Sequence, residues 1–180
     1  MGVSKNKPIN SLSADWYTDD KFLKKEINQI FLKSWLLIGP EAQISNPGDC
    51  LFQSIVDQPV ICVRQEDNSI KTFFNICRHR AGSFENKKSK NNYLVCKYHG
   101  WTYSINGQLR SPRGFNKSEI AVEELCLKYI NTKIWKGLIF INFCYKPKSF
   151  GTTFNYVEKV LAPYKLENFV FEKRISYRIK

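Results

Sequence analysis

Residues Asn75 to Tyr103 read NICRHRAGSFENKKSKNNYLVCKYHGWTY, and this segment contains both histidines of the 180-residue chain. Each histidine closely follows a cysteine: Cys77 and His79 form a C-x-H box, and sixteen residues later Cys96 and His99 form a C-x2-H box. Thiolate together with imidazole narrows a metal site to zinc or an iron–sulfur cluster. We therefore predict that these four residues converge from paired loops as cofactor-binding and metal ligands.

The spacing of the boxes leaves three interpretations open. Structural zinc sites more often combine C-x2-4-C with H-x3-5-H, so a zinc-binding interaction module using the same ligands is an alternative. Without any metal, the cysteines would be small buried hydrophobes and the histidines hydrogen-bonded polar residues. A Rieske-type [2Fe–2S] cluster, in which two His replace two Cys on one iron, matches the mixed boxes best.

Around the boxes, residues 50–143 read as short strands joined by turns. Apolar and β-branched runs predict strands at residues 60–63, 70–74, 93–95, 101–105, 108–109, 127–135 and 138–143. The dipeptide Asn106-Gly107 favours a two-residue type I′ hairpin turn. Because no helical pattern separates these strands, we predict a mainly β fold, an antiparallel sandwich or barrel in which the two boxes form loops.

Helical patterns lie on either side of the β-rich region. Asp19 or Asp20 can cap a helix whose apolar residues recur at three- and four-residue steps up to about Ser34. Near the other end, residues 154–161 predict a short helix, and the alternating residues 169–179 predict a strand with no obvious partner.

Turn signals between these patterns suggest a division of the chain into three parts. We expect an amino-terminal extension with one helix at residues 1–45, a β domain at residues 46–147 and a further segment at residues 148–180.

Composition limits the partners and the compartment. The net charge is +12, but the basic residues are scattered apart from one run at residues 87–90, so we expect no nucleic-acid binding. No apolar run approaches the roughly 20 residues of a membrane helix, and the first residues do not resemble a signal peptide. Six cysteines are too few for a disulfide scaffold in a chain of this length, and we expect a cytoplasmic protein.

The boxes and their surroundings resemble a known family. Residues 75–82 and 96–103 are similar to the cluster-binding region of Rieske non-haem iron oxygenases, the α subunits of ring-hydroxylating dioxygenases and related monooxygenases. Further likeness lies at residues 17–18, 34–35, 47–49 and 135–142. The resemblance implies a Rieske [2Fe–2S] cluster with Cys77 and Cys96 on one iron and His79 and His99 on the other.

Five residues near the ligands would tune such a cluster. Arg78, Arg80 and Lys97 should favour the reduced form by Coulomb attraction. Respiratory Rieske proteins carry, at the position of Trp101, a serine that donates a hydrogen bond to a sulfur. Tyr103, in the same predicted strand, still offers a hydroxyl as a possible hydrogen-bond donor. With fewer donors to the sulfurs, the reduction potential should lie toward the low end of the ~ −150 to +300 mV range for such centres.

The resemblance also implies a function and its partners. Family members oxidise their substrates at a mononuclear Fe(II) held by two His and one carboxylate, and both histidines of this chain are already assigned. We therefore expect no catalytic residue here, and we expect residues 148–180 to be a linker and the start of a truncated catalytic domain. The chain would pass electrons from a reductase or ferredoxin to a catalytic domain or a neighbouring oxygenase subunit, in a family that commonly forms trimers. A stand-alone Rieske ferredoxin is the alternative within the same chemistry.

Overall fold

Two antiparallel sheets form the body of the molecule. The computed structural model describes residues 11–85, 92–173 and 175–177. The larger sheet has six strands in the order β1-β9-β8-β4-β3-β2, namely Leu36–Pro40, Leu138–Asn142, Tyr129–Trp135, Ile70–Phe74, Gln58–Arg64 and Cys50–Ile55. The smaller sheet has three, in the order β5-β6-β7, namely Tyr93–Val95, Thr102–Ser104 and Leu109–Ser111. The predicted mainly β, antiparallel fold is therefore confirmed.

Strand β3 is buried on both of its faces, which explains its uninterrupted apolar sequence. Val60 and Cys62 enter a core cluster with residues of β9, so the larger sheet curls toward closure around this cluster. Ile61 and Val63 point the other way, into a second cluster that includes Tyr103 of the smaller sheet. The alternation of β3 thus places this strand between two core clusters, one within the larger sheet and one shared with the smaller sheet.

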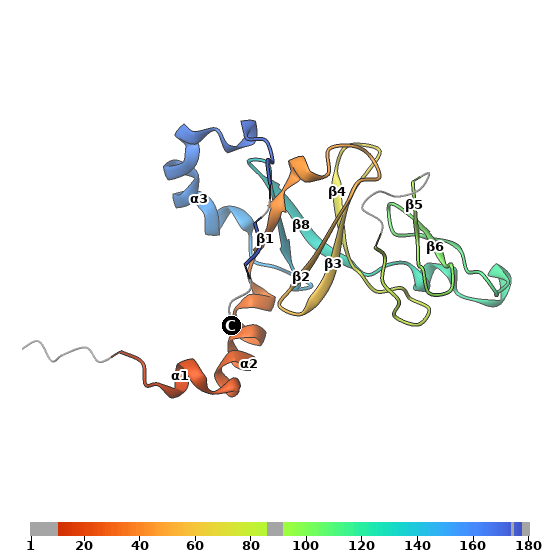
Figure 1. Cartoon of the computed structure of the whole chain (residues 1–180), viewed down its shortest axis with the longest axis horizontal. Coiled ribbons are helices and arrows are strands. Elements are labelled where there is room, and N and C mark those ends of the chain that lie inside the picture. The colour runs from red at the N-terminus through yellow and green to blue at the C-terminus, as the bar shows by residue number, and fades with distance from the viewer. Residues whose placement is uncertain (1–10, 86–91, 174, 178–180) are drawn as a thin grey trace, which may run out of the picture.

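The smaller sheet lies at one end of the molecule and the helix α3 at the other (Figure 1). The connection between β6 and β7 differs from the predicted type I′ turn, because Gly107 is the one residue of that connection with a positive φ, 88°. The amide of Gly107 donates to Ser104 O at 2.8 Å, and Gly107 O accepts from Leu127 N at 2.8 Å. A backbone hydrogen bond from Leu127, two residues before β8, Tyr129–Trp135, thus holds this turn.

The amino-terminal region contains α1, Asp15–Thr18, and α2, Asp20–Gln29, followed by the 3-10 turn η1, Phe31–Lys33. Asp19 caps α2 by accepting from Lys21 N at 2.8 Å, as predicted, but the helix ends five residues before Ser34. None of the residues of α2 is buried: Leu23 is exposed, and Phe22 and Ile27 are half-buried. Strand β1 follows and pairs with β9, and residues 1–45 thus contribute an edge strand to the larger sheet.

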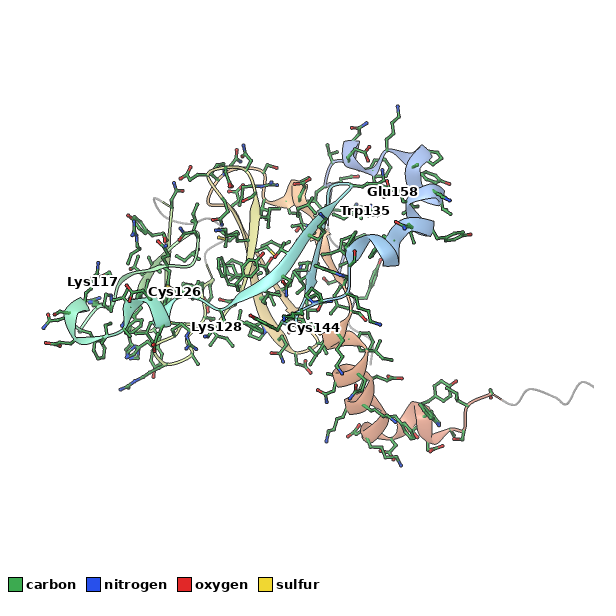
Figure 2. The ribbon with its side chains drawn as sticks, turned by 180° about the vertical axis from the view of Figure 1, so that it is seen from behind. Lys117, Cys126, Lys128, Trp135, Cys144 and Glu158 are labelled. Atoms are coloured by element: carbon green, nitrogen blue, oxygen red, sulfur yellow. The ribbon has the colours of Figure 1, made fainter. Side chains whose placement is uncertain are left out.

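The carboxyl-terminal region begins with α3, Phe150–Leu161, four residues earlier than predicted. Phe150 and Phe154 stack and pack on Trp135 and Phe140, while Glu158 accepts from Trp135 Nε1 at 2.5 Å. Figure 2 shows Trp135 and Glu158 together at this end of the molecule. The short 3-10 turns elsewhere are η2, Glu41–Gln43, η3, Lys117–Glu119, η4, Val122–Leu125, η5, Ala162–Tyr164, and η6, Leu166–Asn168.

The strand predicted at residues 169–179 is not present in residues 169–173 and 175–177, which form no regular element. Residues 174, 178 and 179 of the prediction lie outside the described residues. Residues 169–173 line a hollow with Pro40 of β1 and Leu138 of β9 but join no strand pairing, and Val170 and Tyr177 are more than four-fifths exposed, so alternation alone did not make a strand here. In the described ranges, no helix has the length and apolar content to cross a bilayer.

Gly107 gives a test of how closely the two sheets approach. A Cβ on Gly107 would lie 2.5 Å from Phe73 Cε1, whereas a Cβ on Gly114, which has a similar φ of 90°, would meet nothing within 4 Å. We expect Gly107→Ala to cost about 3 kcal/mol through backbone strain plus overpacking, and Gly114→Ala about 1 kcal/mol through strain alone. Urea unfolding measures both, and equal losses would contradict the close approach.

Candidate metal centre

The two boxes form loops of the same shape. In the first loop, Cys77 N donates to Gly82 O at 2.7 Å and Ala81 N donates to Cys77 O at 3.0 Å. In the second, residues 96–101 repeat both bonds at the same spacing, each at 2.9 Å. Ala81 and Gly100 hold equivalent positions with φ of 57° and 74°. Each cysteine is thus at the start of a turn that closes through its own backbone.

Gly82 lets the two loops touch. A Cβ on Gly82 would lie 2.9 Å from Cys96 Sγ and 3.0 Å from Tyr98 Cβ, so only a glycine leaves room for this approach. The first loop follows β4, and the second connects β5 to β6. The two boxes, sixteen residues apart in the sequence, therefore become neighbours because the smaller sheet folds onto the larger one.

The two thiols are buried side by side. Cys77 and Cys96 are 3% and 2% exposed. Burial raises the pKa of the Cys77 thiol, and the adjacent Cys96 raises it further. Two neighbouring thiolates would be costly in this environment without a compensating cation, because burial disfavours each charge and like charges repel. A metal that replaces the two protons would remove that cost.

The two imidazoles lie on the same side of the loops, with ring centroids 4.7 Å apart. His79 stacks on Trp101 at 4.7 Å and 7°, and His99 stacks on Tyr98 at 3.8 Å and 29°. Burial lowers the pKa of His79, and the charges of His99 and Arg80 lower it further. His79 is therefore held neutral, the form in which an imidazole nitrogen can bind a metal.

Three buried nitrogens have no hydrogen-bond partner among the described residues: Arg78 Nε, His79 Nδ1 and Trp101 Nε1. Buried polar atoms are normally paired, so orphans gathered at one place indicate a missing group. A free Nδ1 lone pair suits a metal, and two N–H groups suit an electron-rich acceptor such as sulfide. The residues present therefore fit an iron–sulfur cluster.

No three His, Cys, Asp or Glu side chains within the described ranges are arranged to hold a single metal ion. The thiols lie together and the imidazoles lie together, which is a pairwise arrangement. A two-iron cluster needs two protein ligands on each iron and therefore suits this arrangement better than one tetrahedral zinc ion does.

The hydroxyl of Tyr103 lies beside the first cysteine. It is 3.5 Å from Cys77 Sγ and accepts a hydrogen bond from Arg78 N at 3.1 Å. Since the backbone amide already occupies one lone pair, the hydroxyl hydrogen is available to the sulfur, and a thiolate can only accept it. Tyr103 is fully buried, and burial raises its pKa, so it stays a donor.

The basic side chains predicted near the cluster differ in whether a carboxylate balances their charge. Lys97 forms an exposed ion pair with Glu85 at 2.6 Å, and this hydrogen bond lowers the pKa of the carboxyl. The charge of Lys97 is thus largely balanced. Arg80 is exposed and forms no ion pair within the described part of the chain.

Sequence reasoning missed two residues outside the boxes, Arg113 and Phe115. Phe115 lies edge-on to the rings of His79 and Trp101, at 5.6 and 5.8 Å. Arg113 Cδ lies 3.2 Å from where a Cβ on Gly100 would be. In the sequence, Pro112-Arg113-Gly114 indicates a turn just after a strand. Only the pairing of β7 with β6 shows that this turn lies next to the second loop.

Comparisons with known proteins point to one family. Residues 34–124 match the family described as Rieske [2Fe-2S] domain. The chain is 31% identical over 159 residues to a glycine betaine monooxygenase oxygenase subunit from Pseudomonas aeruginosa, covering 88% of this chain and 37% of that protein. It is 36% identical over 138 residues to a benzene 1,2-dioxygenase subunit alpha from Pseudomonas putida, covering 71% of this chain and 29% of that protein. The chain thus spans about a third of the length of these curated relatives.

Solved structures share the fold. The apo form of the quaternary ammonium Rieske monooxygenase CntA superposes with a TM-score of 0.79 at 21% identity, over 87% of this chain and 47% of that one. Naphthalene 1,2-dioxygenase from a Rhodococcus species superposes with a TM-score of 0.70 at 26% identity, over 79% of this chain and 34% of that one.

Gly82 provides a test of whether the contact between the loops matters for metal binding. Gly82→Ala should force the loops apart at a cost of about 1–3 kcal/mol, which corresponds to roughly 5- to 150-fold weaker metal retention. The matched control is Gly151→Ala in α3, where a Cβ meets only Ser149 Oγ at 3.9 Å. Release of iron to a chelator from reconstituted protein measures the effect. Equal release from both variants would show that the approach of the loops is unimportant.

Proposed function

The chain belongs to the Rieske [2Fe-2S] domain family, and we propose that it is the electron-carrying part of a Rieske non-haem iron oxygenase α subunit. The observation that carries this proposal is the meeting of two buried thiols and two imidazoles at two matching loops, with His79 Nδ1 left unpaired. The family match confirms the resemblance seen in the sequence and favours the two-iron cluster over zinc.

In this proposal each pair of like side chains holds one iron. Cys77 and Cys96 bind the first, and His79 and His99 bind the second. The bound cluster supplies one reversible one-electron couple. Reduction adds one negative charge to the site, so Arg78 and Arg80 favour the reduced form by Coulomb attraction. Lys97 contributes less, because Glu85 balances it.

We further propose that residues 46–147 form the electron-transfer domain, with residues 1–45 as an amino-terminal extension and residues 148–180 as a linker and the start of a catalytic portion. Apolar side chains are exposed in both flanks, among them Leu23, Ile30, Phe31, Val160, Phe169 and Val170. A self-contained ferredoxin has no use for two such surfaces, whereas a companion domain or neighbouring subunit would cover them.

The electron donor in this proposal is a reductase or a ferredoxin, and the acceptor is a mononuclear iron in a catalytic domain or in a neighbouring subunit of an oligomer such as a trimer. Both histidines of the chain are at the proposed cluster. We therefore do not propose the mononuclear iron site, which needs two further His and one carboxylate, within residues 1–180. The chain is therefore proposed to carry electrons and not to oxidise a substrate by itself.

The proposal predicts the metal content of the chain. Anaerobic reconstitution with iron and sulfide should give about two irons and two acid-labile sulfides per chain, and the reduced sample should show the EPR signal of a mixed-ligand cluster. Cys96→Ser should abolish this signal. Cys144→Ser should keep it, because that thiol lies outside both loops and donates to Leu32 O at 3.7 Å. One bound zinc without sulfide, or no signal in folded protein, would refute the proposal.

Tyr103 should raise the potential of the site. Tyr103→Phe removes the donor to Cys77 Sγ and leaves the electron-rich reduced state less stabilised. A loss of about 1 kcal/mol corresponds to a potential lower by about 40 mV, since a tenfold ratio is 59 mV for one electron. A mediated redox titration measures the shift. An unchanged or higher potential would exclude the hydroxyl as a donor to the sulfur.

A further inference from the structure

A third loop, residues 112–116, reaches the site from outside the two boxes. Strand β7 ends at Ser111, which pairs with Thr102 at the start of β6. The chain therefore leaves β7 beside Trp101, the last residue of the second loop. Phe115 N donates to Pro112 O at 2.9 Å, so the third loop turns tightly and stays there. Lys117, just after the third loop, lies at the end of the molecule away from Trp135 and Glu158 (Figure 2).

Phe115 covers the side of the His79–Trp101 stack. Its ring centroid is 5.6 Å from that of His79 and 5.8 Å from that of Trp101, and both contacts are edge-on, at 78° and 85°. The side chain is 48% exposed. One part of the ring therefore contacts buried aromatic groups and the other part contacts water, as expected of a residue at the boundary between the site and solvent.

Arg113 occupies the space that Gly100 leaves open. Its Cδ and Nη1 lie 3.2 and 3.4 Å from where a Cβ on Gly100 would be, directly between His99 and Trp101 in the sequence. Arg113 is in none of the ion pairs found among the described residues. Its charge is therefore not balanced by a nearby carboxylate, in contrast to that of Lys97.

The two imidazoles are consequently unequal. Trp101 and Phe115 both cover His79. Among the described residues, the ring of His99 contacts the rings of His79 and Tyr98, and Tyr98 is 62% exposed. Both imidazoles are half-buried, but the third loop adds an aromatic contact to His79 alone and places a cation at Gly100, the residue after His99.

We propose that the third loop tunes the reduction potential through two opposed effects: Phe115 excludes water at His79 and lowers the potential, while Arg113 raises it. This inference rests on the proposed function. The couple adds one electron, taken from a donor protein or a chemical reductant, and breaks no bond, so the site gains one negative charge. Water and a nearby cation both stabilise added negative charge, which fixes the two signs.

The test is a mediated redox titration of the reconstituted 180-residue chain and its variants. Phe115→Ala should let water reach His79. The ratio of reduced to oxidised protein at a fixed applied potential should then increase by roughly 3- to 10-fold, and a tenfold increase corresponds to a reduction potential higher by about 59 mV. Phe115→Leu keeps an apolar cover and should restore most of the wild-type value. Arg113→Met keeps the bulk, removes the charge and should decrease the ratio by roughly 2- to 4-fold, less so at high salt.

Two variants serve as matched controls far from the third loop. Phe31→Ala removes a similarly exposed ring, 40% exposed, from η1, and Lys133→Met removes an exposed cation from β8. Both should leave the potential unchanged. Shifts of the same sign in Phe115→Ala and Arg113→Met, or shifts as large in the controls, would overturn the inference. So would a Phe115→Leu variant that behaves like Phe115→Ala.

A second measurement separates this inference from the proposed function. The indole N–H of Trp101 is buried without a partner, and its exchange with solvent can be followed by NMR in the metal-free chain. Exchange should be faster in Phe115→Ala than in the wild type and in Phe31→Ala. A wild-type chain that binds no two-iron cluster would overturn the redox inference together with the proposed function. A cluster of unchanged potential in every variant would overturn the inference alone.

Discussion

The site depends on the contact between two loops at a glycine. Gly82 lets Cys96 Sγ come so close to the first loop that a Cβ would lie 2.9 Å away, and backbone hydrogen bonds close each loop around its cysteine. This contact puts two thiols side by side in the core, where their charges would repel and where burial already raises the pKa of Cys77. Without a metal these groups are favoured as neutral thiols, and a bound cation would stabilise them as thiolates.

The surroundings of the loops supply what a redox centre needs beyond its ligands. The Tyr103 hydroxyl lies 3.5 Å from Cys77 Sγ, His79 stacks on Trp101, and Phe115 packs edge-on against both rings of that stack. These groups are set by the rigid pairing of β5, β6 and β7, whose core side chains continue into the larger sheet. The first loop follows β4 of the larger sheet, and Cys77 of that loop belongs to the same core cluster.

The segments before and after the two sheets expose more apolar side chains than the sheets do. Helix α2 has no buried residue, and the residues after α3 expose apolar side chains such as Phe169 and Val170. The matched part of this chain spans only 37% and 29% of the two curated relatives, which accords with the proposal that another domain or subunit covers these surfaces. The body binds the proposed cofactor, and the flanks would connect it to the protein that uses the electrons.

The spacing of Cys77, His79, Cys96 and His99 pointed to the site, and short apolar runs located strands such as β3 and β5, because both are properties of neighbouring residues. The shape of the turn at Gly107, the fate of residues 169–177 and the reach of Arg113 and Phe115 did not follow from such patterns. Each depends on tertiary contacts: Phe73 crowds Gly107, Ser111 pairs with Thr102, and residues 169–173 lie beside Pro40 of β1 without joining a strand pairing. A local pattern sets what a segment can form, but the hydrogen bonds and contacts that select among its options come from residues distant in the chain.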